Sequence, residues 1–303
     1  MIQTSSVDEL LTSQSTDPLD FTLKGLLVGH IGMLIAAPHV GKSHLAMCLA
    51  IEHSSSCQLL GMSQSKEPKR TLIINTEDSP GIVKNRLKDK LSALPQSVRK
   101  ELNENLHFLS DLPPIVIPPE SNAEIKKQHT NFLKELVETL KGFDLVIIDT
   151  VTESIGECCE VRHDRLIKNT FQNLAKESNC SILLVHHVNK DEIRGAQKVT
   201  MASGAGLTSI MRLTKCLFTI NARESKSIVF LKSNYLEDNE SQDIPFEVKH
   251  HICVNQNVYK PTVVKARKLK STVLSSEPKS ITLRGIVEQE NDIKDKKSLR
   301  DVL

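Results

Sequence analysis

The chain has 303 residues, of which 39% are hydrophobic and 25% are charged, as is typical of a globular protein with a sizeable core. The formal net charge is only +2, which excludes a uniformly basic coat for nucleic acid but leaves room for a local basic patch. Tryptophan is absent and tyrosine occurs twice, which argues against modules that read single strands on a sheet of stacked aromatic rings.

The chain shows neither a secretory signal nor a membrane span. Residues 1–11 contain Asp8 and Glu9 but no basic residue, and no stretch reaches the roughly 18 to 20 apolar residues of a membrane helix. The seven cysteines form no C-x-x-C pair, and the adjacent Cys158 and Cys159, even with His163 nearby, lack zinc spacing. Reduced thiols, a cytoplasmic location and no membrane partner are therefore expected.

The first two thirds of the chain alternate between predicted strands and helices. Residues 1–18 are rich in Ser, Thr and Asp and are interpreted as a flexible arm. Apolar runs predict strands at Ile31–Ala37, Thr71–Asn75, Leu106–Leu109, Leu145–Ile148 and Ser181–Val185. Helical spacing predicts helices at Ser43–His53, Pro80–Leu94, Ile125–Leu140 and about Leu166–Ala175, whereas Ser54–Arg70 is expected to be a loop.

The pattern changes after Val188. Asn189–Ser203 is polar and is expected to be a mobile loop. Short strands follow without intervening helices, at Leu217–Ile220, Ile228–Leu231 and Ile244–Val248, which indicates antiparallel additions at a sheet edge. We therefore predict one α/β domain over residues 19–258, with a mainly parallel sheet flanked by helices, and a basic, flexible C-terminal tail over 259–303.

A phosphate-binding loop is predicted at the first strand–helix junction. Ala36 to Ser43 matches G-x-x-x-x-G-K-[ST] at its last three positions, with Ala36 in place of the first glycine. The flanking strand and helix favour a nucleotide site over a chance Gly-Lys-Ser. The predicted nucleotide-binding residues are Ala37, Pro38, His39, Val40, Gly41, Lys42, Ser43 and His44. Lys42 is expected on the β- and γ-phosphates and the Ser43 hydroxyl on Mg²⁺.

Acidic residues follow two of the other predicted strands. Asp149 ends an apolar strand and is expected to complete the Mg²⁺ shell with Ser43, the alternative being a simple cap of the next turn. Glu77 follows Thr71–Asn75 and is interpreted as the base that activates water. Asp78 is the competing candidate, but Asp78-Ser79-Pro80 also has the pattern of a helix start.

A histidine pair follows the strand at Ser181–Val185. A polar side chain at this position could sense the γ-phosphate and relay its state to the next loop. A buried histidine satisfied by backbone groups is an equally good reading, and the pair has no obvious partners for a metal site.

In this order, the motifs resemble those of the RecA-like ATPases, and in particular the hexameric RepA replicative helicases of broad-host-range plasmids and the RepA-like AAA proteins of mobile elements. The resemblance runs from about Leu19 to Tyr259. It is carried by Gly41-Lys42-Ser43, Thr76-Glu77-Asp78-Ser79-Pro80, Arg86-Leu87, Ile148-Asp149-Thr150, Cys180-Ser181-Ile182, His186-His187, Leu207 with Arg212, and Lys232-Ser233-Asn234-Tyr235.

The resemblance implies a hexameric ring that hydrolyses ATP with Mg²⁺ at subunit interfaces and moves single-stranded DNA. It makes Lys42 and Glu77 catalytic, His187 the γ-phosphate sensor, Arg212 an arginine finger and Lys232 a second cation acting on the neighbouring subunit. Two channel loops, Glu153–Asp164 and Asn189–Ser203, would contact DNA. Their basic residues, in or beside the loops, are Arg162, Arg165, Lys190, Arg194 and Lys198, which are also readable as solvated loop charges.

Three functions remain in competition at this point. The first is a helicase or translocase for replication of a plasmid or other mobile element, with a replication initiator or primase as a further partner. The second is a recombination or repair ATPase that forms filaments on the same core. The third is a regulator or loader that binds ATP without acting as a motor.

Overall fold

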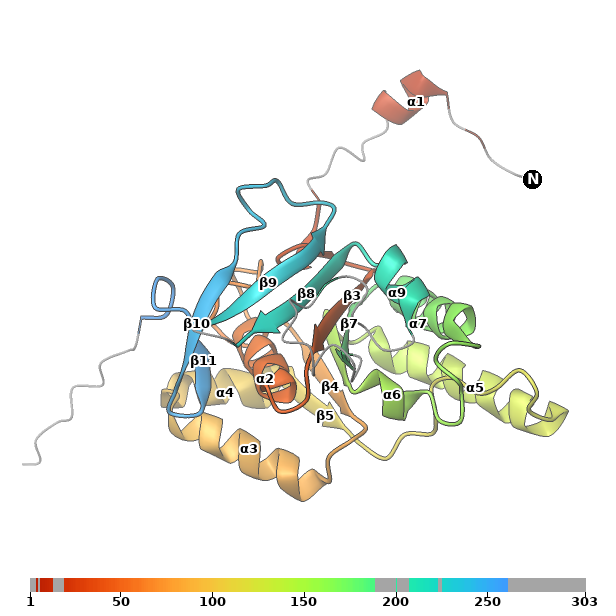
Figure 1. Ribbon diagram of the computed structural model, residues 1–303, viewed down its shortest axis with the longest axis horizontal. Coiled ribbons are helices and arrows are strands. Elements are labelled where there is room, and N and C mark those ends of the chain that lie inside the picture. Colours follow the sequence, from red (N-terminus) through yellow and green to blue (C-terminus); the bar gives the residue numbers. More distant parts are fainter. Residues whose placement is uncertain are drawn as a thin grey trace, which may run out of the picture. The chain divides into compact units, whose positions relative to one another are not determined.

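The computed structural model (Figure 1) describes Thr4, residues 6–12, 19–188, Thr200, 207–222 and 225–260. The described residues all belong to one unit of the chain, Met1–Thr262. Lys190, Arg194, Lys198 and most of the predicted tail lie outside the described residues. Among the described helices, none is long and apolar enough to cross a membrane.

A nine-stranded mixed sheet forms the centre of the fold, in the order β11-β10-β9-β8-β3-β7-β6-β4-β5. The parallel strands are β3 (Ile31–Ala36), β4 (Thr71–Asn75), β5 (Leu106–Leu109), β6 (Leu145–Asp149), β7 (Ser181–His187) and β8 (Cys216–Asn221). Three antiparallel strands extend the β8 edge, namely β9 (Lys226–Ser233), β10 (Ile244–Lys249) and β11 (Ile252–Val254). This topology confirms the predicted α/β core, a mainly parallel sheet flanked by helices with antiparallel strands at one edge.

Helices cover both faces of the sheet because alternate residues of each strand point to opposite faces. In β6, Leu145 and Ile147 belong to one core cluster and Val146 and Ile148 to the other. The first cluster lies under α2 (Lys42–His53), α3 (Pro80–Ser92) and α4 (Gln96–Asn105). The second lies under α5 (Ala123–Leu140), α6 (Val151–Ser154), α7 (Asp164–Ser178) and α9 (Thr208–Leu213), and Figure 1 shows the two groups on different sides of the sheet.

The predicted strands and long helices are confirmed, whereas several short elements were not predicted. They are helix α1 (Val7–Thr12), the hairpin of β1 (Phe21–Leu23) and β2 (Leu26–Leu27), α4, α6, α9 and β11. Helix α4 has a weak apolar pattern because only Val98 and Leu102 are buried. The predicted loop at Ser54–Arg70 is confirmed and contains only an isolated bridge between Leu23 and Ser63.

The strand register brings four strand ends to the same edge of the sheet. Ala36 of β3 lies opposite His187 of β7, and Asp149 of β6 lies opposite both Val185 and Asn75. Because these strands are parallel, the segments that leave their carboxyl ends meet beside one another.

A buried carboxylate joins the far end of α2 to the loop that follows it. Glu52 is 3% exposed and accepts hydrogen bonds from the backbone N–H groups of Leu60 (2.8 Å), Met62 (2.9 Å) and Ser63 (3.2 Å). The loop can therefore bury Leu60 and Met62 without leaving these donors unsatisfied.

We expect Glu52→Ala to lower the free energy of unfolding by about 3 kcal/mol or more, because it removes the acceptor of three N–H donors in a buried loop. Urea denaturation followed by circular dichroism measures the loss. Glu101→Ala is the matched control, since Glu101 accepts the backbone N–H of exposed Ser56 (2.7 Å) and its loss should cost less than about 1 kcal/mol. Equal losses in the two variants would contradict the anchoring role of Glu52.

Candidate nucleotide-binding site

The loop between β3 and α2 turns through two residues with positive φ. His39 has φ 64° and Gly41 has φ 103°, and Gly41 forms the N-cap of α2. A side chain at Gly41 would be strained in this conformation, so glycine is required here. The N–H groups of the first turn of α2 have no partner within the helix and form an anion-binding end.

The departure of Ala36 from the usual motif has a simple structural explanation. Ala36 is the last residue of β3 and is fully buried, and its carbonyl accepts the N–H of Val188 (3.2 Å). Since its backbone is an ordinary part of the strand, this position has no need of the conformational freedom of glycine.

Lys42 lies across its own loop. Its side chain is 6% exposed, and Nζ donates a hydrogen bond to the carbonyl of Ala37 (3.1 Å). Burial lowers the pKa of Lys42, while the negative charges of Asp149 and Glu77 raise it. The Lys42 ammonium is thus close enough to interact electrostatically with both predicted acidic residues, Asp149 and Glu77.

Asp149 and Ser43 form the oxygen-rich part of the site. Burial raises the pKa of Asp149, opposed by a hydrogen bond from the Ser43 side chain, while the charges of Glu77 and Asp78 add to the rise. Oδ1 of Asp149 is buried and has no hydrogen-bond partner. A carboxylate oxygen without a partner beside a hydroxyl is a donor set that fits a hard divalent cation.

The two acidic residues after β4 have different surroundings. Glu77 is 50% exposed, and its Oε2 lies 3.8 Å from Nε2 of His187. Both carboxylate oxygens of Asp78 instead accept hydrogen bonds from the Arg86 guanidinium on α3. Glu77 is therefore more open to water than Asp78, whose side chain is 18% exposed and bonded to α3.

Thr76 and Thr150, to which the sequence assigned no role of their own, hold the strand ends together. The N–H of Thr76 donates to the carbonyl of Asp149 (3.0 Å), and its hydroxyl donates to the carbonyl of Thr150 (2.8 Å). These bonds join the segments that carry Glu77 and Asp149. Their only sequence signal is a polar residue directly after each apolar strand.

The two histidines at the end of β7 have separate partners. Burial and the charge of Lys42 lower the pKa of His187, and Glu77 raises it. His186 is fully buried, with Nδ1 3.4 Å from the Thr152 hydroxyl and Nε2 4.0 Å from Oε2 of Glu160. The structure thus brings His187 together with Lys42 and Glu77, and places His186 against the segment after β6.

The side chain of His44 points away from the phosphate loop. Nδ1 of His44 lies 2.7 Å from Nζ of Lys90, and burial together with the charge of Lys90 lowers the pKa of His44 to about 4. Only the backbone N–H of His44 is therefore placed to contact a phosphate.

Arg212 and Lys232 are brought together, but not with Lys42. Arg212 is exposed on α9, and Nζ of Lys232 donates to its backbone carbonyl. The hydroxyl of Thr214 contacts the carbonyl of Ile31 (2.6 Å), so this pair lies at the amino end of β3, whereas the phosphate loop follows its carboxyl end. Within one chain, Arg212 and Lys232 therefore lie at the opposite end of the parallel strands from the phosphate loop.

The described candidates for DNA contact are both exposed. Arg162 lies in the turn before α7, and Arg165 lies in the first turn of α7. The neighbouring His163 is buried, with Nδ1 accepting the N–H of Cys159 (3.1 Å). The second predicted channel loop, which carries Lys190, Arg194 and Lys198, lies outside the described residues.

The fold and the loop between β3 and α2 define an α/β domain of the P-loop class. The chain belongs to the AAA_25 family of AAA domains, whose family model matches residues 1–192. Lys42, Glu77, Asp149 and His187 fall within the match, whereas Arg212 and Lys232 lie beyond it. Among solved structures, the chain is similar to the RadB recombinase, at 13% identity and a TM-score of 0.47, covering 75% of this chain and 91% of that one.

The contacts of His187 predict a pattern of pKa changes. In the nucleotide-free protein the pKa of His187 should lie below its ordinary value of 6.5. Glu77→Gln should lower it further, because a nearby negative charge is lost, and Lys42→Met should raise it, because a nearby positive charge is lost. Titration of the imidazole resonances by NMR, assigned with His187→Gln, measures these shifts.

Asp78→Asn is the control for this titration. Asp78 is paired with Arg86, so its substitution should leave the pKa of His187 almost unchanged. A shift as large as that of Glu77→Gln would contradict the described geometry.

Proposed function

We propose that this chain is an ATP-driven motor that forms a ring, hydrolyses ATP between subunits and moves along single-stranded DNA in the replication of a plasmid or other mobile element. The observation that carries the ATPase part is the meeting of Lys42, Asp149, Glu77 and His187 at one sheet edge. The DNA and ring parts rest on the sequence resemblance to RepA-like helicases and on the placement of the basic residues.

Lys42 and the N–H groups at the start of α2 bind the phosphates of ATP in this proposal. Ser43 and Asp149 hold Mg²⁺, as the partnerless Oδ1 of Asp149 suggests. The ion supplies positive charge that offsets the charge developing on the phosphate oxygens. Bound Mg²⁺ would give Oδ1 of Asp149 a partner, and bound phosphate would give the buried Lys42 ammonium a negatively charged one.

Glu77 is the proposed base. It accepts a proton from water as the water oxygen attacks the γ-phosphorus, and the bond from the γ-phosphorus to the β–γ bridging oxygen breaks, leaving ADP and phosphate. His187 has a lowered pKa and is therefore neutral at pH 7, so it can donate a hydrogen bond without adding a charge. Its contact with Glu77 links the γ-phosphate to the base.

Arg212 and Lys232 are proposed to act on a neighbouring subunit. Both lie toward the amino end of β3, away from the phosphate loop of their own chain. A cation that reaches the γ-phosphate of another subunit stabilises transition-state charge and ties hydrolysis to assembly. Arg162, Arg165 and the basic residues of 189–203 are the proposed contacts to DNA phosphates.

ATP hydrolysis measured with and without single-stranded DNA, beside a sizing measurement, tests the proposal. DNA should stimulate hydrolysis in a protein that elutes as an oligomer. Glu77→Gln should lower kcat about 100-fold or more while ATP still binds, because the base is lost. Asp78→Asn, the matched control, should have a far smaller effect.

Other outcomes would reject parts of this proposal. A monomer without DNA stimulation would reject the motor, and retained ATP binding in that case would favour a regulator or loader. Helical filaments in electron micrographs with ATP and single-stranded DNA would reject the ring and favour a recombination ATPase. Loss of hydrolysis in Asp78→Asn but not in Glu77→Gln would reverse the assignment of the base.

Mixing two inactive variants tests the role of Arg212 across the interface. Lys42→Ala and Arg212→Ala should each lose hydrolysis, the latter by about 1000-fold. Mixed oligomers should recover activity, because an intact phosphate loop can then face an intact Arg212. Arg99→Ala, an exposed arginine on α4, is the control and should keep full activity. Failure of the mixture to recover activity, with mixed oligomers verified, would exclude action in trans.

A further inference from the structure

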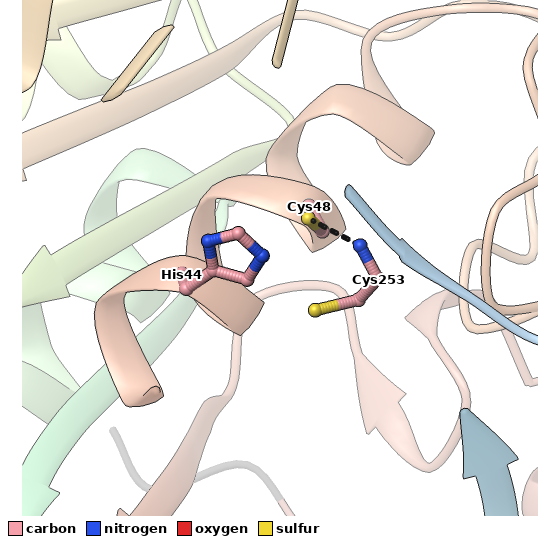
Figure 2. Close-up of side chains that lie close together, drawn as sticks. All are labelled: His44, Cys48 and Cys253. Carbon is pink, nitrogen blue, oxygen red and sulfur yellow. Dashed lines mark hydrogen bonds between the residues drawn. The ribbon is translucent and has the colours of Figure 1, made fainter. Parts of the chain in front are cut away.

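A cluster of one histidine and two cysteines lies directly behind the phosphate loop. His44 and Cys48 are one turn apart on α2, so they share a face of the helix, and Cys253 belongs to β11, which packs against α2. Their ligand atoms all lie within 4.8 Å of one another. Figure 2 shows the His44 ring and both cysteine side chains converging on one region between the helix and the strand.

The two thiols are deeply buried and one of them already accepts a hydrogen bond from the backbone. Cys48 and Cys253 are at most 1% exposed, and the N–H of Cys253 donates to Sγ of Cys48 (3.3 Å). Such a bond favours the thiolate, which is the form that binds metal ions. One imidazole and two thiolates form a donor set suited to Zn²⁺.

The protein itself already places a positive charge among these donors. Nζ of Lys90, from α3, lies 2.7 Å from Nδ1 of His44, 3.6 Å from Sγ of Cys48 and 2.8 Å from the carbonyl of His251. Lys90 is only 1% exposed. An ammonium buried this deeply persists only where the surrounding groups are arranged to accept a cation.

We propose that His44, Cys48 and Cys253 form a binding site for a thiophilic divalent cation, Zn²⁺ being the best match. Two thiols lose their protons as two metal–sulfur bonds form, neutral His44 adds a metal–nitrogen bond, and the Lys90 ammonium gives way to the ion. The site ties His44, which directly follows Ser43 in α2, and Cys48 to the last described strand, where Cys253 lies 205 residues beyond Cys48.

Cobalt binding to the full-length chain tests this site directly. After metal is removed with a chelator under reducing conditions, Co²⁺ should bind as a single ion per chain. Binding should produce sulfur-to-cobalt charge-transfer absorption and the visible bands of tetrahedral Co²⁺, and Zn²⁺ should displace it. Cys48→Ser and Cys253→Ser should each lose the charge-transfer band or most of its intensity. Cys180→Ser, another buried cysteine outside the cluster, should leave the spectrum unchanged.

Lys90→Met provides an independent test that keeps all three ligands. Because it removes the competing ammonium, it should tighten Co²⁺ binding by about tenfold or more. Absence of the charge-transfer band in the stripped wild-type protein would overturn the proposal, as would a band that survives both cysteine substitutions. Unchanged or weaker Co²⁺ binding by folded Lys90→Met would overturn the claim that the Lys90 ammonium competes with the metal ion for this site.

Discussion

The parallel register of β3, β7, β6 and β4 is the constraint on which the site depends. These strands are buried on both faces and end within two residues of one another in the register, so the residues that follow them meet without any loop having to reach across the sheet. The Thr76 bonds to Asp149 and Thr150 then fix two of these strand ends against each other. A one-residue slip in this register would send Asp149 to the opposite face.

The ionisable groups packed around α2 show how the core accommodates polar side chains, and burial raises the pKa of one of them, Glu52, to about 7. Lys42, Glu52 and Lys90 are all at least nine-tenths buried, and each is bonded to backbone groups. Backbone partners cannot be lost by substitution of a neighbouring side chain, so these groups are held by the path of the chain itself. These bonds join α2 to Ala37 and to the loop at Leu60, and through Lys90 of α3 to His251.

Much of the sheet could be predicted from the sequence, because strands buried on both faces are continuous apolar runs such as Leu145–Ile148. Helix α4 could not be predicted because it buries only two side chains. Strands β1 and β2 could not be predicted because they are too short to show a pattern. The sequence could propose Lys42, Ser43, Glu77, Asp149 and His187 as site residues because each lies at or shortly after the carboxyl end of a strand.

Contacts between residues distant in sequence could not be predicted in the same way. The partner of Asp78 was not evident until α3 placed Arg86 beside it. The pairing of Cys48 with Cys253 depends on β11, a strand of three residues that has no signal of its own. The spacing of His44 and Cys48 on one helix face was present in the sequence, but two ligands do not define a site without the third.

The separation of Arg212 from Lys42 along β3 gives the domain two unlike ends. In the proposed arrangement, the arginine end of one subunit meets the phosphate-loop end of the next, so the contact repeats head to tail. A closed assembly supplies every loop with a neighbour, but an open one leaves a terminal loop without its arginine. The number of sites able to hydrolyse ATP then equals the number of interfaces between subunits. The rate of ATP hydrolysis per subunit therefore measures how many of the assemblies are closed.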